Sequence, residues 1–143
     1  MIDINKNIIR RVLEEGGNRH DIAVIRELYP NVVYHAPLVG ELRGEAYRRF
    51  VASVLDAFPD AHWTIEDQIA EDDRVMTRWS FVGTHKERFM DIAPTGKKVR
   101  ISGMCIDRIV EGKIVEEWEE FDGLGMMRQL GAVPAHIEEP VAA

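Results

Sequence analysis

The chain has 143 residues, of which 45% are hydrophobic and 30% are charged, and its formal net charge is -7. This length predicts one domain that is large enough to bury a core. The negative charge argues against binding to nucleic acid, whose phosphates require a basic surface, and gives no attraction to an anionic membrane. No apolar run reaches the roughly 18 residues of a membrane-spanning helix. We therefore expect a globular protein that binds neither nucleic acid nor membranes.

Cysteine and histidine usage bounds the compartment and the metal chemistry. The only cysteine is Cys105, so we expect no internal disulfide, and residues 1–16 lack the apolar core of a signal peptide. Both observations favour a reducing, cytoplasmic compartment. The five histidines show no metal-ligand spacing with one another or with the cysteine. Because nucleotide-binding and zinc-binding motifs are also missing, the sequence predicts neither a metal nor a cofactor.

The first part of the chain is dominated by helical periodicity. Apolar residues recur at helical spacing over 4–15, and the glycine pair that follows predicts the end of this first helix. A second helix is expected over 22–28, where Asp21 is a suitable N-cap. Residues 31–36 are typical of a short strand. The strongest apolar stripe predicts a long helix over 45–58.

After Pro59 the apolar period changes to two, which is typical of strands with one buried face. Four long strands are predicted, over 61–72, 74–88, 97–110 and 113–122. The turns between them are short, so neighbouring strands must be antiparallel. A last helix over 124–130 is expected to end at a glycine. Helices followed by a strand meander predict a single α+β domain, 1–131, with helices covering one face of a curved sheet, and a C-terminal tail, 132–143.

The most unusual segment is the run EEWEEFD before the last helix, in which acidic residues surround two aromatic rings. As a strand it places Trp118, Glu120 and Asp122 on one face. If residues 111–112 form a two-residue turn, Cys105 lies opposite Trp118. This register predicts a pocket wall that combines a ring with carboxylates and small neighbours. A slip of one residue would turn the opposite face toward the pocket.

Several segments resemble one known family. The helix after GELRG, the strand RVMTRWSFVGTH, the turn APTGKKV and the end GKIVEEWEEFDGLGMMRQLG are similar to the SnoaL-like polyketide cyclases. That family belongs to the nuclear transport factor 2-like superfold, and the resemblance covers residues 5–131. It implies a cone-shaped α+β barrel with N-terminal helices packed on a curved, mainly antiparallel sheet around a deep apolar pocket. It also implies a homodimer or a homotetramer, and we expect the outer face of the sheet to form the contact.

The resemblance also implies a reaction. In the studied cyclases the aspartate at the end of a W-x-x-x-D strand is the general acid/base, which here corresponds to Asp122 after Trp118. The implied chemistry is a cofactor-free intramolecular aldol closure of a polyketide ester, so the expected partner is a small, apolar, carbonyl-bearing ligand. Those cyclases support the aspartate with a histidine on the preceding strand. The corresponding segment ISGMCIDRIV has none, so we assign this role to His85, with His35 as the alternative.

Each candidate residue also has a purely structural interpretation. Asp122 directly precedes a helix and is a favoured N-cap, and Trp118 suits a core position. Arg78 can anchor a substrate oxygen or pair with a carboxylate, and the sequence does not decide which face of its strand lines the pocket. Cys105 is typical of a small core residue that borders the site. Glu120 shares the face of Asp122, and two neighbouring carboxylates on one face can raise the pKa of one of them.

Three functions are consistent with these residues. The leading hypothesis is the cyclase. The first alternative is a non-enzymatic domain that binds a small apolar ligand in the same pocket. The second is another reaction of the superfold, namely isomerisation, dehydration or epoxide hydrolysis, since each can use a carboxylate in an apolar cone.

Overall fold

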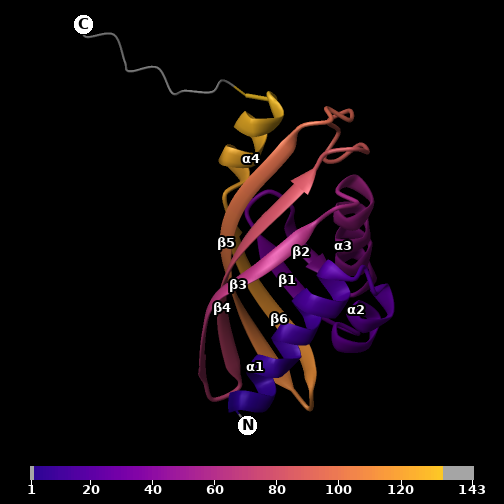
Figure 1. The fold of residues 1–143 in the computed structure, drawn as a ribbon. Coiled ribbons are helices and arrows are strands. Elements are labelled where there is room, and N and C mark those ends of the chain that lie inside the picture. Colours follow the sequence, from indigo (N-terminus) through magenta and orange to yellow (C-terminus); the bar gives the residue numbers. More distant parts are fainter. Residues whose placement is uncertain (1, 134–143) are drawn as a thin grey trace, which may run out of the picture.

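The computed structural model describes residues 2–133, and Figure 1 shows them as a curved sheet with helices packed against one side. The helical elements are α1 (Ile2–Arg11), η1 (Val12–Asn18), α2 (Ile22–Leu28), α3 (Glu45–Ala57) and α4 (Gly123–Leu130). The strands are β1 (Val33–Ala36), β2 (Gly40–Arg43), β3 (His62–Glu71), β4 (Arg74–Thr84), β5 (Lys98–Val110) and β6 (Lys113–Phe121). The predicted C-terminal tail, 132–143, lies outside the described residues from position 134 onward.

The predicted helices are confirmed, except that the first one does not end at its glycine pair. The chain continues from α1 into a π-helix, η1, which contains Gly16 and Gly17. A Cβ at Gly16 would lie 2.5 Å from Cδ1 of Ile25, and one at Gly17 would lie 2.8 Å from Cε3 of Trp63. The glycines therefore let the helix approach α2 and β3 closely. The Asp21 carboxylate caps α2 by accepting a hydrogen bond of 3.1 Å from the Ala23 N–H.

The sheet has six strands in the order β2-β1-β6-β5-β4-β3. All neighbours are antiparallel except β1 and β6, which are parallel. The mainly antiparallel α+β fold is thus confirmed, but the edge strands β2 and β3 do not pair, so the sheet wraps around the helices without closing. Strand β2 was not predicted, because the segment GELR lacks the apolar alternation of the other strands.

The predicted register between β5 and β6 is wrong by one residue. Val110 pairs with Lys113 and Ile109 with Ile114, as expected, but Arg108 pairs with Glu116, which leaves Val115 without a partner on β5. This β-bulge shifts every later pair. Cys105 consequently lies opposite Glu119 instead of Trp118. The face of β6 that meets the helices carries glutamates, and the tryptophan points outward.

Two clusters of buried side chains fill the space between the sheet and the helices. One lies around α1, α2 and the start of β1, and includes Val24, Leu28 and Tyr34. The other lies toward α4, and includes Phe58 and Phe81. On β4, the residues that face inward are those on the Trp79 face, which settles the orientation that the sequence left open. In the described part of the chain, no helix combines the length and apolarity that a bilayer crossing requires.

Candidate functional site

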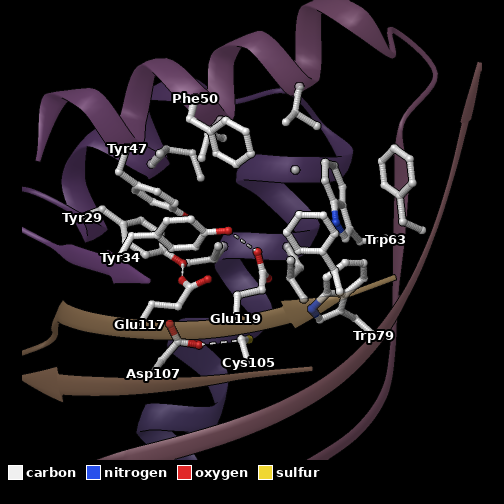
Figure 2. Close-up of a pocket in the computed structure, with 18 of the residues that line it drawn as sticks. Tyr29, Tyr34, Tyr47, Phe50, Trp63, Trp79, Cys105, Asp107, Glu117 and Glu119 are labelled. Carbon is white, nitrogen blue, oxygen red and sulfur yellow. Dashed lines mark hydrogen bonds between the residues drawn. The ribbon is translucent and has the colours of Figure 1, made fainter. Parts of the chain in front are cut away.

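A cavity of about 140 Å³ lies between the helices and the inner face of the sheet. Helices α1, α2 and α3 contribute aliphatic and aromatic side chains to it, and α4 contributes Met126. The sheet supplies two tryptophans, Trp63 from β3 and Trp79 from β4 (Figure 2). The other apolar side chains in the lining are Ile9, Val12, Leu13, Ile25, Phe50, Val51, Val54, Phe58, Phe81, Phe89, Ile101 and Phe121.

Three carboxyl groups interrupt this apolar lining. Asp107 on β5 and Glu117 on β6 are almost fully buried, at 1% and 3% exposure. Glu119, two residues further along β6, keeps some accessible surface, and it also lines the cavity. Among the described residues, no lysine, arginine or histidine lines the cavity. The acids are therefore surrounded by rings and hydroxyl groups and have no cation to pair with.

Each carboxyl group accepts a hydrogen bond from a neutral donor (Figure 2). The Tyr34 hydroxyl on β1 donates to Oε1 of Glu119 over 2.7 Å. The Tyr29 hydroxyl, directly after α2, donates to Oε1 of Glu117 over 3.1 Å. The Cys105 thiol donates to Oδ2 of Asp107 over 3.4 Å. These donors orient the acids without supplying positive charge.

The tyrosine rings form a layer above the carboxyl groups. The Tyr47 ring on α3 lies 4.9 Å from the Tyr29 ring and 4.6 Å from the Tyr34 ring, measured between centroids. Burial raises the pKa of all three hydroxyls well above the ordinary value of 10.0. The tyrosines therefore stay protonated and act as donors throughout the neutral range.

Burial also raises the pKa of each acid, because the charged form loses its hydration. At Glu119, burial and then the charge of Glu117 raise the pKa to about 8, against the opposing hydrogen bonds from Tyr34 and Trp79. Burial raises the pKa of Asp107 to about 7. The pKa of Glu117 is raised well above its ordinary value by burial and by the charge of Asp107. A carboxyl whose pKa lies near neutrality can both release and accept a proton at working pH.

A metal site is not needed to explain this cluster. Cys105, Glu117 and Glu119 each offer an atom of ligand type, and these atoms lie within 4.8 Å of one another. Both glutamates, however, already accept hydrogen bonds from tyrosines, and the thiol donates to Asp107. The network of neutral donors and protonatable acids accounts for the geometry.

The structure separates Trp118 and Glu120 from the cavity. Both lie on the outer face of β6, because of the register shift. The Trp118 ring stacks on the His35 ring, with centroids 5.6 Å apart and an angle of 15° between the planes. The Arg74 guanidinium lies 5.5 Å above the same ring. The sequence-based assignment of Trp118 and Glu120 to the pocket wall is therefore wrong.

The remaining polar candidates also lie away from the cavity lining. Asp122 is the N-cap of α4, and its Oδ1 accepts a hydrogen bond of 2.9 Å from the Gly125 N–H, which confirms its structural interpretation. Nε2 of His35 lies 2.9 Å from Oε2 of Glu116 on the outer face. Arg78 points outward from β4 and is exposed.

His85 is fully buried, yet it does not line the cavity. Its Nδ1 accepts a hydrogen bond of 3.3 Å from the Thr95 N–H and lies 3.0 Å from Oγ1 of the same residue. Its backbone also bonds to the loop, since the His85 N–H donates to Lys97 and the carbonyl accepts from Gly96. This histidine therefore fixes the connection between β4 and β5. Of the seven predicted site residues, the structure places only Cys105 in the cavity.

The residues that form the polar end of the cavity were not predicted from the sequence. Asp107 was detectable, because on its strand it alternates with Ile101, Cys105 and Ile109 and is the only charged residue of that face. A lone acid on an otherwise apolar strand face indicates a buried carboxyl. Glu119 carried no such signal, since acidic residues occupy both faces of β6.

Comparison with known proteins identifies the family. The family model described as "SnoaL-like polyketide cyclase" matches residues 7–130, so the chain belongs to this family. The chain is similar to the solved structure of AclR from Streptomyces galilaeus, a proposed hydroxylase, with 27% identity, 94% of this chain and 100% of that chain covered, and a TM-score of 0.84. It is also similar to IdmH from Streptomyces antibioticus, a proposed polyketide cyclase, with 29% identity, coverage of 89% and 98%, and a TM-score of 0.76.

A third similar structure is TsrD from Streptomyces laurentii, with 26% identity, 92% of this chain and 97% of that chain covered, and a TM-score of 0.80. No match is found among curated proteins. The matched chains are covered almost completely, so the likeness concerns the whole domain and not a fragment of it.

Proposed function

We propose that the protein is a cofactor-free polyketide cyclase in which Glu119 is the general acid/base. The observation that carries this proposal is the position of the Glu119 carboxyl, which is set into an apolar, ring-lined cavity and oriented by the Tyr34 hydroxyl. Burial brings its pKa to about 8. Family membership supports the class of reaction. We assign the acid/base role to Glu119 instead of Asp122, which the sequence suggested, because Asp122 does not line the cavity.

The proposed reaction is an intramolecular aldol closure of a small ester. The Glu119 carboxylate removes a proton from a carbon between two carbonyls, which breaks the C–H bond and leaves an enolate. The enolate carbon attacks a second carbonyl carbon of the same molecule, so a C–C bond forms and the carbonyl oxygen becomes an alkoxide. Glu119 returns its proton to this alkoxide. The product is an isomer of the substrate, and no electron acceptor or donor is consumed.

The size and charge of the cavity define the substrate class. A volume of about 140 Å³ is close to that of an engineered protein cavity of about 150 Å³ that binds benzene. The cavity as it stands therefore accommodates one six-membered ring. The polar end of the cavity carries acids, and no lysine, arginine or histidine of residues 2–133 lines it. Negative charge on these acids would therefore repel a substrate with a free carboxylate. An uncharged ester suits this lining better than the corresponding acid.

A substrate panel tests the proposal. The panel contains methyl esters of linear polycarbonyl acids whose chain can close one six-membered ring, together with the matching free acids. We expect the esters to give an isomeric cyclic product and the acids to turn over at least tenfold more slowly, as judged by liquid chromatography with mass detection. A product that gains one oxygen atom would instead favour a hydroxylase, the activity proposed for AclR. Release of every ester unchanged would reject the cyclase.

We propose further that two copies of the chain associate through the outer face of the sheet. Ile69, Met76, Ile106 and Trp118 are cross-strand neighbours and form one row over β3 to β6. Ile69 and Ile106 are 58% and 39% exposed, and contiguous exposed apolar side chains favour association.

We expect the wild type to have the mass of two or four chains in light scattering and Ile106→Glu to have a lower mass. The matched control is Ile4→Glu, an exposed isoleucine on α1. Equal masses for wild type and Ile106→Glu would exclude this contact.

A further inference from the structure

Asp107 and Glu117 form a pair of buried carboxyl groups whose geometry requires a proton. They are direct cross-strand partners on β5 and β6. Their side chains lie side by side at the polar end of the cavity (Figure 2), and each influences the protonation of the other. Two ionised carboxylates only accept hydrogen bonds, so this contact needs a proton on one of them.

A second observation agrees with the shared proton. The Cys105 thiol donates to Oδ2 of Asp107. Oδ1 of the same carboxyl is buried and has no hydrogen-bond partner among the described residues. A buried acceptor without a donor destabilises the folded state. A proton held between the two carboxyls removes this destabilisation.

Among residues 2–133, no positively charged side chain lines the cavity around the pair to stabilise a doubly ionised state. Tyr29 after α2, Tyr47 on α3 and Tyr34 on β1 face it from the helical side and from the neighbouring strand. Cys105 and Glu119 face it from β5 and β6. These groups are neutral donors or further acids. Two carboxyls in such an environment do not both ionise in the neutral range.

We propose that Asp107 and Glu117 hold one proton between them and that the negative charge remaining on the pair raises the pH up to which the neighbouring Glu119 stays protonated. Glu119 lies two residues from Glu117 on the same face of β6, and Cys105 separates it from Asp107 on β5. In this proposal the pair acts through Glu119, so both members are positioning residues. Any effect of the pair on turnover rests on the proposed function of Glu119. The sharing of a proton between Asp107 and Glu117 does not depend on that function.

The two members of the pair differ in their expected effect on Glu119. Glu117→Gln removes the charge that is nearest to Glu119, so the pKa of Glu119 falls. Asp107→Asn removes the competitor of Glu117 and supplies an amide donor to it. Glu117 then ionises more readily, and its charge keeps the pKa of Glu119 at or above the wild-type value. A purely structural role in packing gives no reason for shifts of opposite sign.

The experiment is a pH titration of the glutamate side-chain carbons by ¹³C NMR, without any substrate. Protein labelled at the glutamate carboxyl carbon is titrated as wild type, Glu117→Gln and Asp107→Asn, and the Glu119 resonance is assigned by its loss in Glu119→Gln. Glu116→Gln is the matched control, since this neighbour on β6 lies on the outer face beside His35. Near-ultraviolet circular dichroism checks that each variant keeps its tertiary structure.

We expect the Glu119 midpoint to fall by one pH unit or more in Glu117→Gln, and to stay or rise in Asp107→Asn and Glu116→Gln. In the wild type, Glu117 should be only partly protonated at neutral pH, because it shares the single proton of the pair with Asp107. A Glu119 midpoint that is unchanged in Glu117→Gln, or that falls equally in both variants of the pair, would overturn the proposal. So would the loss of the fold in both isosteric variants, because a pair that shares one proton tolerates an amide in place of either acid. Because no substrate is involved, these outcomes are independent of whether Glu119 proves to be the acid/base.

Discussion

Glu119→Gln is expected to lower the rate of ring closure by about 10²–10⁴-fold while leaving the fold intact, because general acid/base catalysis by one side chain contributes an effect of this size. Glutamine keeps the shape and still accepts the hydrogen bond from Tyr34, but it cannot remove a proton. The measurement is the single-turnover rate on an ester of the panel described above. The pH profile gives a second signature: since the base form of Glu119 starts the reaction, the wild-type rate should rise with pH and level off above about 8.

The control for this prediction is Asp122→Asn. Asparagine caps a helix nearly as well as aspartate, so this variant should keep both the fold and the rate within a few-fold of wild type. The opposite pattern, with turnover lost in Asp122→Asn and retained in Glu119→Gln, would return the catalytic role to the residue that the sequence suggested.

The stability of the protein is expected to fall as pH rises from about 4 to about 8. For a carboxyl whose pKa is higher in the folded chain than in the unfolded chain, the folded state binds more protons in this range, and stability declines with pH. The contribution is complete below the ordinary values of 3.8 and 4.5 for Asp107 and Glu119, and it is lost as pH passes through about 7 and about 8. The change at Glu119 alone corresponds to a few kcal/mol, a large share of the 5–15 kcal/mol that is usual for a domain.

Urea unfolding at several pH values between 4 and 8 measures this slope. We expect Glu119→Gln and Glu117→Gln each to flatten it, because each removes one buried titrating group. Asp60 does not disturb the comparison: hydrogen bonds from Thr84 lower its pKa, so it destabilises the fold only when pH falls below its ordinary value of 3.8. Stability that is constant or rises between pH 5 and 8 in the wild type would show that the three acids are ionised in the folded protein.

Much of the fold follows from local sequence patterns. The change from helical spacing to alternation at Pro59 separates the helices from the four long strands, and turns at Asp72 and Gly112 fix their antiparallel order. The pairing of β1 with β6 was not predictable in this way. Partners that are more than eighty residues apart and parallel leave no signal in a turn, and the short strand β2 forms only because β1 offers it an edge.

The site was harder to predict than the fold, because it depends on a single extra residue. The turn at Gly112 predicts the first pair of β5 and β6 correctly, and regular pairing then places Trp118 inside. The bulge at Val115 inverts this assignment for the rest of the strand. On β6 both faces are acidic, so hydrophobic alternation could not reveal the error. Asp122 illustrates a second limit, since a helix cap and a catalytic acid share the same residue type.

The most direct test of the account is the titration of Glu119 in the wild-type protein. The ¹³C resonance of its carboxyl carbon, assigned through Glu119→Gln, reports the protonation of this one group across the pH range. We predict a midpoint near 8, which is the value expected for an acid/base held in an apolar cavity whose described lining carries no cation. A midpoint near the ordinary value of 4.5 would mean that Glu119 is a solvated carboxylate, and would contradict the assignment of this cavity as the catalytic site.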